Sequence, residues 1–448
     1  MRLKLLPLLL CLGLVPLPSH GEDLMDAFRQ AIANDPVLAN SDAQRLVVAE
    51  QVPQARSALL PQLSAGLGVE QIHGGAGGST TDANGNIVPT GMGGYTRERN
   101  FSGSLTQPII NLASIANLRA AHSTDDAQEE TYRAALQNLY VRVATAYFNV
   151  LQSQDQLDIN KAYEDGYKQE FEQTSVRFKN GLAMSADVNQ AQAFYLYIKS
   201  ARISSEDMLK DAERGLEQIT GKPTGTLMKL RDELPMETPT PNDAKAWADA
   251  AMETNPTILA ARYTVKADEH RISAARAGHL PTLIAGVNYN KFGSWSNRIP
   301  GSSSYEPGTT TVGLTLSVPL FSGGFTQSQV RQAIHQRDAD ADTLESQRRQ
   351  AARDSYNYFN LVVDGIEQVQ TARDSVAAAE KSLSSLKAGY EIGTQQLFVV
   401  VQAIEILAES RITYTQQRYQ FVLNKLLLKQ SAGTIDVHDL EDVNRLLQ

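Results

Sequence analysis

Two long stretches without helix-breaking residues constrain this chain more than any other feature. Residues 112–178 contain no proline and one glycine, Gly166, and residues 325–388 contain no proline and only Gly365. At 1.5 Å per residue, a continuous helix over either stretch is about 95–100 Å long, far longer than the core of one ordinary domain. Such helices must therefore bury a seam against each other.

Hydrophobic spacing marks that seam. Apolar residues recur at alternating steps of three and four in both stretches, as in coiled coils. They are Leu136, Tyr140, Val143, Tyr147 and Val150 in the first stretch, and Ile366, Val369, Ala372, Val376, Ala379, Leu383, Leu386 and Tyr390 in the second. A glycine-containing turn and a return helix follow each stretch, so the pattern predicts two helical hairpins with tips near 179–187 and 390–400.

The chain also repeats itself once. The segment NDPVL around Pro36 recurs as TNPTIL around Pro256, and YFNV at 147–150 recurs as YFNL at 358–361. Several such pairs keep a nearly constant offset. We therefore expect two structural repeats, over 22–220 and 243–432. A proline-rich linker at 221–242 joins them, and a tail follows at 433–448.

Each repeat contains a strand–loop–strand segment, at 62–110 and 282–320. A proline, Pro61 or Pro281, ends the helix before it. From Leu63 to Glu70, apolar residues alternate with small or polar ones. Such two-faced strands are typical of outer-membrane barrels with lipid outside and water inside. A soluble hairpin packed on a core is the alternative, but the Gly, Ser and Thr face suits a wet lumen better. The sequence predicts strands at 63–72, 101–109, 283–292 and 311–320, with a loop at 73–99.

The N-terminus has the features of a secretory signal. Residues 1–21 combine a basic start at Arg2 and Lys4, an apolar run from Leu5 to Leu17, and small residues before a cleavage site after Gly21. Removal of this segment takes away Cys11 and changes the net charge from −9 to −11. An acidic balance argues against a general nucleic-acid-binding protein. We expect a protein that is exported across a bacterial inner membrane and uses neither disulfides nor thiol chemistry.

Four strands per chain form an open sheet with unpaired edge strands. They cannot close a barrel, and an open edge facing lipid would leave backbone N–H and C=O groups without partners. Three chains would contribute twelve strands, an even number within the known range. We therefore expect a homotrimer in which the long helices continue from a shared barrel as a hollow cylinder. The fold class is mainly α with a membrane β-barrel.

Several segments resemble the TolC family of outer-membrane efflux proteins. They are EDLMDAFRQAIANDPVL, ARSALLPQL, the YFN pair, the tips RFKNGLAMSADV and GYEIGTQQLFVV, and the tail SAGTIDVHDLEDVNRL. The resemblance covers essentially the whole mature chain. It implies a trimeric channel-tunnel with a barrel in the outer membrane, a helical conduit in the periplasm, and an equatorial region that includes the linker and the tail. It also implies that the tips, at Gly181, Leu182, Gly393 and Thr394, dock a periplasmic adaptor. The adaptor would connect the duct to an inner-membrane efflux pump or ABC transporter that exports drugs, toxic compounds or polypeptides.

The resemblance also implies a gate at the periplasmic end. In the family, a network at the helical tips holds this end nearly shut. Position by position, its tyrosine is Tyr390 and its partner aspartate is Asp187, while the family's arginine corresponds to Gln395. Tyr390 also falls on the heptad, so it could be a seam residue, a gate residue, or both. A phenol–carboxylate hydrogen bond is worth about 1.5–3 kcal/mol, little enough for a docking partner to open it.

The pore entrance departs from the family pattern. The two aspartates that ring the family's constriction correspond to Val399 and Gln402 in this chain. A trimer would therefore lack six carboxylates there. We expect a weaker preference for cations, and weaker block by divalent cations, than in a family member that carries both acids.

No motif indicates catalysis, a metal or a cofactor. The seven histidines form no H-x-x-x-H pair, and Asp338, Asp340 and Asp342 do not all share one helical face. The glycines at 74–78 are followed by no Lys-Ser/Thr pair. The sequence therefore predicts a passive duct that is not an enzyme and needs no cofactor. The alternative is a periplasmic coiled-coil scaffold that forms no channel.

Overall fold

The computed structural model describes residues 21–74, 79–89, 94–296, 303–305 and 307–448. The predicted signal segment lies outside these residues, apart from Gly21. The chain divides into two compact units, one formed by Met1–Ser41, Arg133–Pro256 and Arg348–Gln448, the other by Asp42–Tyr132 and Thr257–Gln347. Both sequence repeats contribute to both units, so this division runs across the repeats rather than between them.

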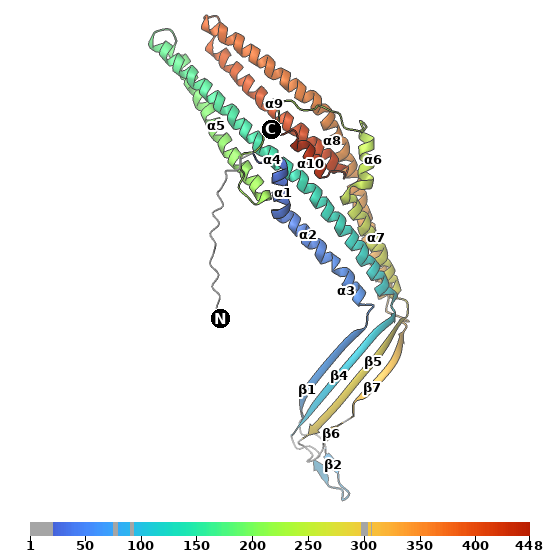
Figure 1. Cartoon of the computed structure of the whole chain (residues 1–448). Coiled ribbons are helices and arrows are strands. Elements are labelled where there is room, and N and C mark those ends of the chain that lie inside the picture. The colour runs from blue at the N-terminus through green and yellow to red at the C-terminus, as the bar shows by residue number, and fades with distance from the viewer. Residues whose placement is uncertain (1–20, 75–78, 90–93, 297–302, 306) are drawn as a thin grey trace, which may run out of the picture. The chain divides into compact units, whose positions relative to one another are not determined.

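Four strands of the second unit form one antiparallel sheet (Figure 1). They are β1 (Gln62–Gly74), β4 (Gly94–Ile110), β5 (Thr282–Ser296) and β7 (Thr309–Ser317), in the order β1–β4–β5–β7. The short β6 (Ser303–Tyr305) also pairs with β5, while β2 (Ser79–Thr81) pairs with β3 (Ile87–Pro89). Because β4 pairs with β5, the central pairing joins the two repeats.

The strand register separates an apolar face from a polar one. Leu63, Leu105, Val287 and Val312 are successive cross-strand partners and share one face. Ser64, Ser104, Asn288 and Thr311 are partners on the other face, where the hydroxyls of Ser64 and Ser104 are 2.7 Å apart. The alternation predicted from the sequence is therefore a property of the whole sheet.

Several strand boundaries differ from the predicted ones; β5, for example, runs to Ser296 rather than to residue 292. β4 begins at Gly94, whereas the sequence predicted a loop as far as residue 99, because Arg97, Glu98 and Arg99 hide the alternation. β7 ends at Ser317 rather than at Leu320. Pro319 has no N–H to donate to a strand ladder, which explains the earlier end.

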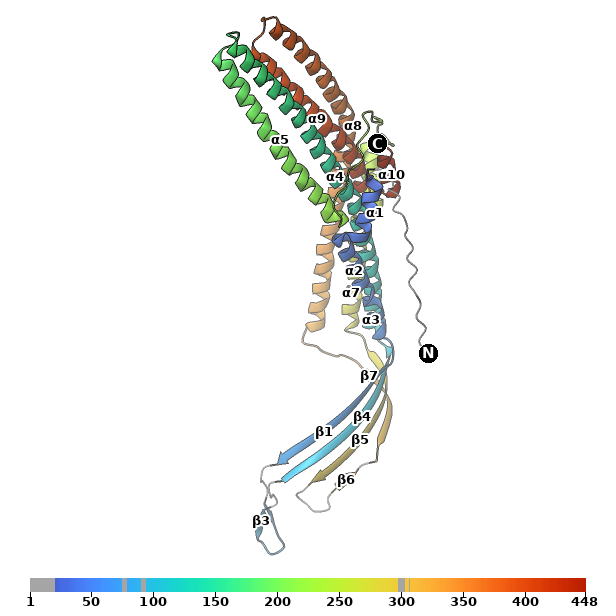
Figure 2. The same cartoon turned by 60° about the vertical axis from the view of Figure 1, so that its left-hand side comes forward.

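The long helices form two hairpins in the first unit (Figure 2). α4 (Leu112–Lys179) returns through α5 (Ser185–Thr220), and α8 (Phe325–Glu391) returns through α9 (Leu397–Ser431). The N-terminal parts of α4 and α8 belong to the second unit. That unit also contains α3 (Gln51–Ser57) and most of α7 (Pro256–Ala277), which lead into β1 and β5. The short α2 (Pro36–Ala49) precedes α3.

The linker and the tail meet beside the chain's N-terminal segment. Residue Glu22 forms a β-bridge with Leu227, and Leu230 forms one with Leu447. The hydroxyl of Tyr147 donates to the carbonyls of Glu22 and Met228 at 3.0 and 2.9 Å. Three short helices complete this region: α1 (Leu24–Asn34), α6 (Ala244–Thr254) and α10 (Val437–Asn444).

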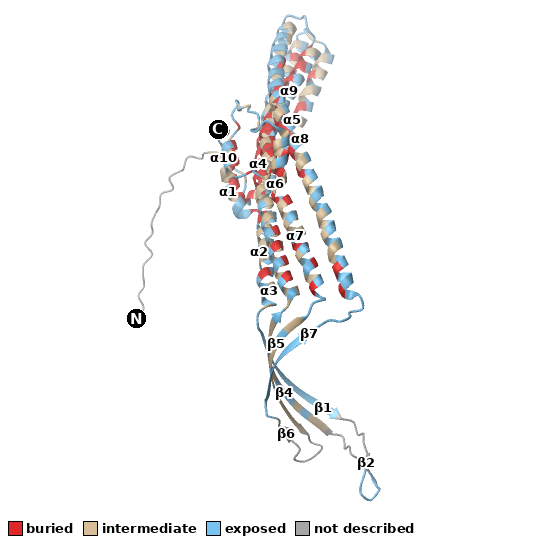
Figure 3. Ribbon diagram, turned by 90° about the vertical axis from the view of Figure 1, so that its right-hand side faces the viewer, coloured by how far each residue is buried: buried red, intermediate tan, exposed pale blue. Residues whose placement is uncertain are grey.

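Burial is concentrated in the helices, whereas the strand side chains whose burial the structure describes are exposed or intermediate (Figure 3). Leu63 and Leu67 on β1 are 81% and 74% exposed in the single chain. Apolar side chains at that exposure need a further apolar environment. Among the described residues, no helix combines the length and the apolar character that crossing a bilayer requires.

Candidate gate at the helical tips

Both helical hairpins turn through the same backbone motif. At the first tip, the N–H of Leu182 donates to the carbonyl of Arg177 at 2.8 Å, and Gly181 donates to Phe178 at 2.9 Å. At the second tip, Thr394 donates to Gly389 at 2.9 Å, and Gly393 donates to Tyr390 at 3.0 Å. This pair of bonds defines a Schellman motif, which satisfies the last carbonyls of the ending helix.

The motif explains why a glycine stands at each tip. Gly181 has φ +75° and Gly393 has φ +78°, in the left-handed region that side chains disfavour. At the first tip, Leu182 and Met184 are 72% and 74% exposed, and at the second tip Ile392 is 77% exposed. The predicted docking positions are therefore displayed on solvent-facing turns with apolar neighbours.

Asp187 caps the helix that returns from the first tip. It occupies the third position of α5, and its carboxylate accepts a hydrogen bond from the backbone N–H of Met184 at 3.0 Å. A carboxylate there also interacts favourably with the positive end of the helix dipole. Within the single chain, the Asp187 carboxylate therefore caps its own helix.

The equivalent region of the second tip carries no such acid. Val399 occupies the third position of α9, and Gln396 before the helix makes no side-chain capping bond. The backbone N–H of Gln395 donates to the carbonyl of Gly389 at 3.2 Å, and the Gln395 side chain is exposed. Gln402 is exposed and Val399 is half-buried.

Tyr390 joins the two hairpins. The guanidinium carbon of Arg177 on α4 lies 5.1 Å from the centre of the Tyr390 ring on α8, a cation–π distance. The ring also packs against the buried cluster described below. Among the described residues, no hydrogen bond joins Tyr390 to Asp187. The structure therefore brings Tyr390 together with an arginine that the sequence pattern did not indicate.

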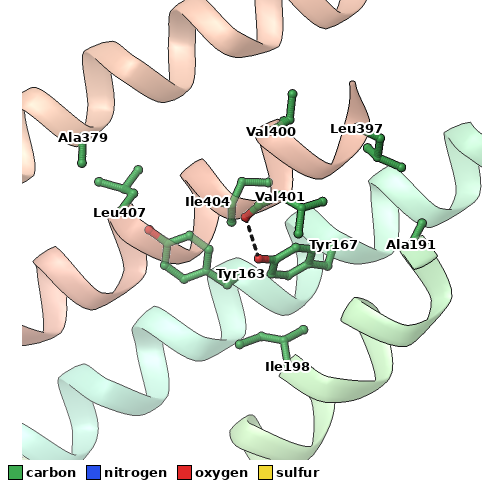
Figure 4. Close-up of a cluster of buried hydrophobic side chains, with 10 residues drawn as sticks. All are labelled: Tyr163, Tyr167, Ala191, Ile198, Ala379, Leu397, Val400, Val401, Ile404 and Leu407. Carbon is green, nitrogen blue, oxygen red and sulfur yellow. Dashed lines mark hydrogen bonds between the residues drawn. The ribbon is translucent and has the colours of Figure 1, made fainter. Parts of the chain in front are cut away.

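A buried cluster lies behind the tips (Figure 4). It combines side chains from α4, α5, α8 and α9, namely Tyr163, Tyr167, Ala191, Ile198, Ala379, Leu397, Val400, Val401, Ile404 and Leu407. The hydroxyl of Tyr167 donates to the carbonyl of Val401 at 3.3 Å, across the two hairpins. Within the first hairpin, Tyr167 stacks on Phe194 and Phe171 stacks on Tyr195.

Polar atoms without partners line the same side of α4. In the described chain, the hydroxyls of Tyr163 and Thr174 and one carboxylate oxygen of Glu170 are buried and make no hydrogen bond. Their spacing follows the heptad, so they face the seam. Each such group costs about 1–3 kcal/mol relative to a paired one. A polar residue at a seam position of the heptad could have indicated these buried groups. Glu170 and Thr174 were not singled out because such residues are also typical of a solvated helix face.

Burial shifts the pKa values of two groups in the seam. Desolvation raises the pKa of the Glu170 carboxyl, although the positive charges of Lys387 and Arg177 oppose that shift. Burial likewise raises the pKa of the Tyr163 hydroxyl, so this group stays neutral at physiological pH. An ion pair between α8 and α9 joins Glu380 to Arg411 at 2.7 Å. The seam is therefore a mixture of apolar contacts and incompletely compensated polar groups.

The aspartate run on α8 has a different arrangement. Burial and the nearby Asp340 raise the pKa of Asp268 on α7, while Arg271 pairs with Asp268 at 2.6 Å. Asp340 also accepts from the side chain of Gln336 at 3.0 Å. Among the described residues, no group of three or more His, Cys, Asp or Glu side chains is placed to hold a metal ion.

Comparisons with known proteins identify the family and the fold of the chain. The sequence model of the family "Outer membrane efflux protein" matches residues 27–222 and 247–434, one match to each repeat. The outer membrane protein TolC of Vibrio cholerae is 31% identical, over 98% of this chain and 98% of that protein. The alkaline protease secretion protein AprF of Pseudomonas aeruginosa is 25% identical, over 93% of this chain and 86% of that protein. The crystal structure of the Campylobacter jejuni CmeC outer membrane channel has a TM-score of 0.76 at 15% identity, over 95% and 90% of the two chains.

Proposed function

Because the chain belongs to the outer membrane efflux protein family, we propose that it is the passive exit duct of an export system, opened at its helical tips. The chain is an outer-membrane efflux and secretion channel protein of a Gram-negative bacterium. Its family and its fold are those of channels rather than of known enzymes. The observation that carries the proposal is the family match over both repeats, which contain the two-faced sheet and the two hairpins.

The assembled duct is a homotrimer in this proposal. β1 and β7 are the edge strands of the four-stranded sheet, and their apolar side chains are largely exposed in one chain. Pairing of β7 with β1 of the next copy would remove both edges, as a membrane requires. Native mass spectrometry of the detergent-extracted protein tests this directly. We expect three copies, each starting at Glu22 after cleavage of the signal segment, and a monomer or dimer would contradict the proposal.

The tips receive the partner proteins in this proposal. A periplasmic adaptor docks around Gly181, Leu182, Gly393 and Thr394 and couples the duct to an inner-membrane efflux pump or ABC transporter. Exposed Leu182, Met184 and Ile392 provide apolar surface at these turns. Energy for transport then comes from the transporter.

The gate opens by separating the two hairpins. The Arg177–Tyr390 contact and the Tyr167–Val401 hydrogen bond join them, and both are individually modest. The unpaired polar atoms of Tyr163, Glu170 and Thr174 regain water when the seam opens, which lowers the cost of opening. In the assembled duct, Tyr390 and Asp187 contribute to the closed state, and Val399 and Gln402 line the constriction. Gln395 stands where the family has an arginine, so the ionic link made by that arginine is missing.

Substitution of Tyr390 separates the seam and gate roles of its side chain. Tyr390→Phe keeps the ring beside Arg177 but removes the hydroxyl. If the hydroxyl bonds to Asp187 of the closed duct, the conductance of Tyr390→Phe in a lipid bilayer rises, and Asp187→Asn raises it similarly. If neither substitution changes the conductance, Tyr390 acts only through its ring.

Deletion of the chain tests the cargo. Loss of the duct should increase susceptibility to toxic compounds, reduce the export of a polypeptide, or do both, because AprF is a protease secretion protein and other relatives are efflux channels. Drug susceptibility and exported proteins are measured in parallel, with the intact chain restored as the control. A deletion strain that changes in neither respect, while the protein is present in wild-type outer membranes, contradicts the export function.

A further inference from the structure

The charged side chains of the membrane sheet are sorted by sign onto its two faces. Arg97, Arg99 and Lys291 lie on the apolar face, because their cross-strand partners include Gln71, Val69 and Phe101. Glu70 and Glu98 are cross-strand partners on the opposite, polar face. Within β1, β4, β5 and β7, these five are the charged residues, apart from His73 if it is protonated. All three permanent cations therefore share a face with the residues that contact lipid in the proposed function.

The two arginines lie where the apolar stretch of β1 ends, whereas Lys291, the partner of Phe101, lies one step nearer the helices, level with Leu67. From Leu63 to Val69 the exposed apolar side of β1 extends over about 20 Å along the strand, and the lipid-facing band of outer-membrane barrels is about 25 Å tall. Arg99 is opposite Val69, and Arg97 is opposite Gln71, farther from the strand ends that connect to the helices. A cation costs little on a lipid-facing surface near the membrane interface but several kcal/mol at its centre.

Aromatic side chains accompany both arginines. The guanidinium of Arg97 lies 4.8 Å from the centre of the Tyr95 ring, and that of Arg99 lies 4.8 Å from the Trp295 ring. Arg97 also donates to the side chain of Gln71 at 2.7 Å. Tyr and Trp are enriched at membrane interfaces, so they mark the same level. The rings hold both guanidinium groups on the outer surface, and among the described residues no carboxylate forms an ion pair with either.

We propose that Arg97, Arg99 and Lys291 form a binding site for the phosphate groups of a lipid headgroup in the outer leaflet. Two guanidinium groups with planar donor forks match phosphate oxygens, and the adjacent apolar face accommodates acyl chains of the same lipid. A soluble anion would gain only the first of these interactions. This inference rests on the proposed function, because it requires the apolar face to contact the bilayer.

The experiment measures lipids retained by the full-length protein. The assembled duct is reconstituted in phosphatidylcholine nanodiscs containing lipid A, released, and weighed by native mass spectrometry. We expect preferential retention of lipid A with both phosphates over its monophosphorylated form, and no displacement by excess inorganic phosphate. Arg97→Gln/Arg99→Gln should lower retention by at least about tenfold, since each interfacial cation is worth about 1 kcal/mol.

Two matched variants complete the design. Arg97→Lys/Arg99→Lys preserves the charge but not the planar forks and should retain less lipid than the intact protein and more than the glutamine pair. Glu98→Gln alters a charge on the opposite face and should change nothing. An intact protein without preference for the phosphorylated lipid overturns the proposal, whatever the variants do. So does equal loss in Glu98→Gln. An intact protein that conducts no ions across a bilayer contradicts the proposed function instead, which separates the two failures.

Discussion

The two helical tips share a turn but differ in the first residues of their return helices. Gly181 and Gly393 adopt the same left-handed conformation within the same pair of backbone hydrogen bonds. Three residues into the return helix, however, the first tip has Asp187, whose carboxylate caps α5, and the second has Val399. The first return helix begins with exposed Ser185, while the second begins with buried Leu397. The first is thus held by a polar cap and the second by apolar burial.

This difference indicates how two duplicated hairpins come to be stabilised in different ways. A Schellman turn depends on backbone geometry, so both copies keep it with little restriction on neighbouring side chains. The start of a return helix can be stabilised by a carboxylate or by packing. The second tip uses packing, which leaves the predicted constriction at Val399 and Gln402 without acids.

Loss of packing at the second tip should have the largest effect. Leu397→Ala removes a side chain that is only 4% exposed and should destabilise the start of α9 by about 2–4 kcal/mol. Ser185→Ala at the equivalent place on α5 should change the free energy by less than about 0.5 kcal/mol. Hydrogen exchange over each return helix measures both losses of stability. Equal losses would contradict the claim that apolar packing stabilises only the second return helix.

Loss of the cap at the first tip should have a smaller effect. Asp187→Ala removes the acceptor for the Met184 N–H and should cost about 1 kcal/mol, seen as faster exchange in the first turn of α5. Asn189→Ala, at an exposed position slightly farther along the same helix, serves as the control. Unchanged exchange in Asp187→Ala would show that the carboxylate does not stabilise this helix.

Adding an acid to the second tip should make it resemble the first. Val399→Asp places a carboxylate at the start of α9, which should stabilise that turn by about 0.3–1 kcal/mol through the helix dipole. In a trimer it also adds three negative charges to the constriction, so the reversal potential in a salt gradient should shift toward cation selectivity. Val399→Asn separates charge from polarity. An unchanged reversal potential in Val399→Asp would place this residue away from the ion path.

The smallest expected effect is a change of channel opening with pH. The pKa of Glu170 is raised in the closed chain, so protonation favours the closed seam over an open one in which the carboxyl meets water. This stabilisation is complete below the ordinary value of 4.5 and disappears as the pH rises through the raised pKa. Channel opening should therefore decrease as the pH falls from 7 toward 4.5. Glu170→Gln should lose that dependence, and an identical pH profile would exclude Glu170 as its source.

Much of this architecture was predictable from local sequence rules. The absence of proline over 112–178 and 325–388 located α4 and α8 to within a few residues at each end, and glycine marked both tips. The sequence could not indicate which seam positions are polar and buried, because Glu170 and Thr174 have the composition of a solvated helix face. Arg177 was missed for a similar reason, since its partner Tyr390 lies on the other hairpin.

The strands show a related limit. Alternation was clear where apolar and small residues alternate, as in β1, and failed at Arg97, Glu98 and Arg99, where all side chains are charged. Only the cross-strand register reveals that these charges are sorted between two faces. The family resemblance indicated the positions of the predicted gate residues but not their contacts in this chain.

Single-channel recording in planar bilayers tests the central claim, that this chain forms a duct closed by contacts between its two hairpins. The intact protein should conduct weakly, and Arg177→Ala, which removes the cation above the Tyr390 ring, should increase conductance or the open fraction. Lys179→Ala, an exposed cation at the end of α4, serves as the control and should leave the gate unchanged. Absence of current from all three proteins, or identical currents from the intact protein and Arg177→Ala, would contradict the account.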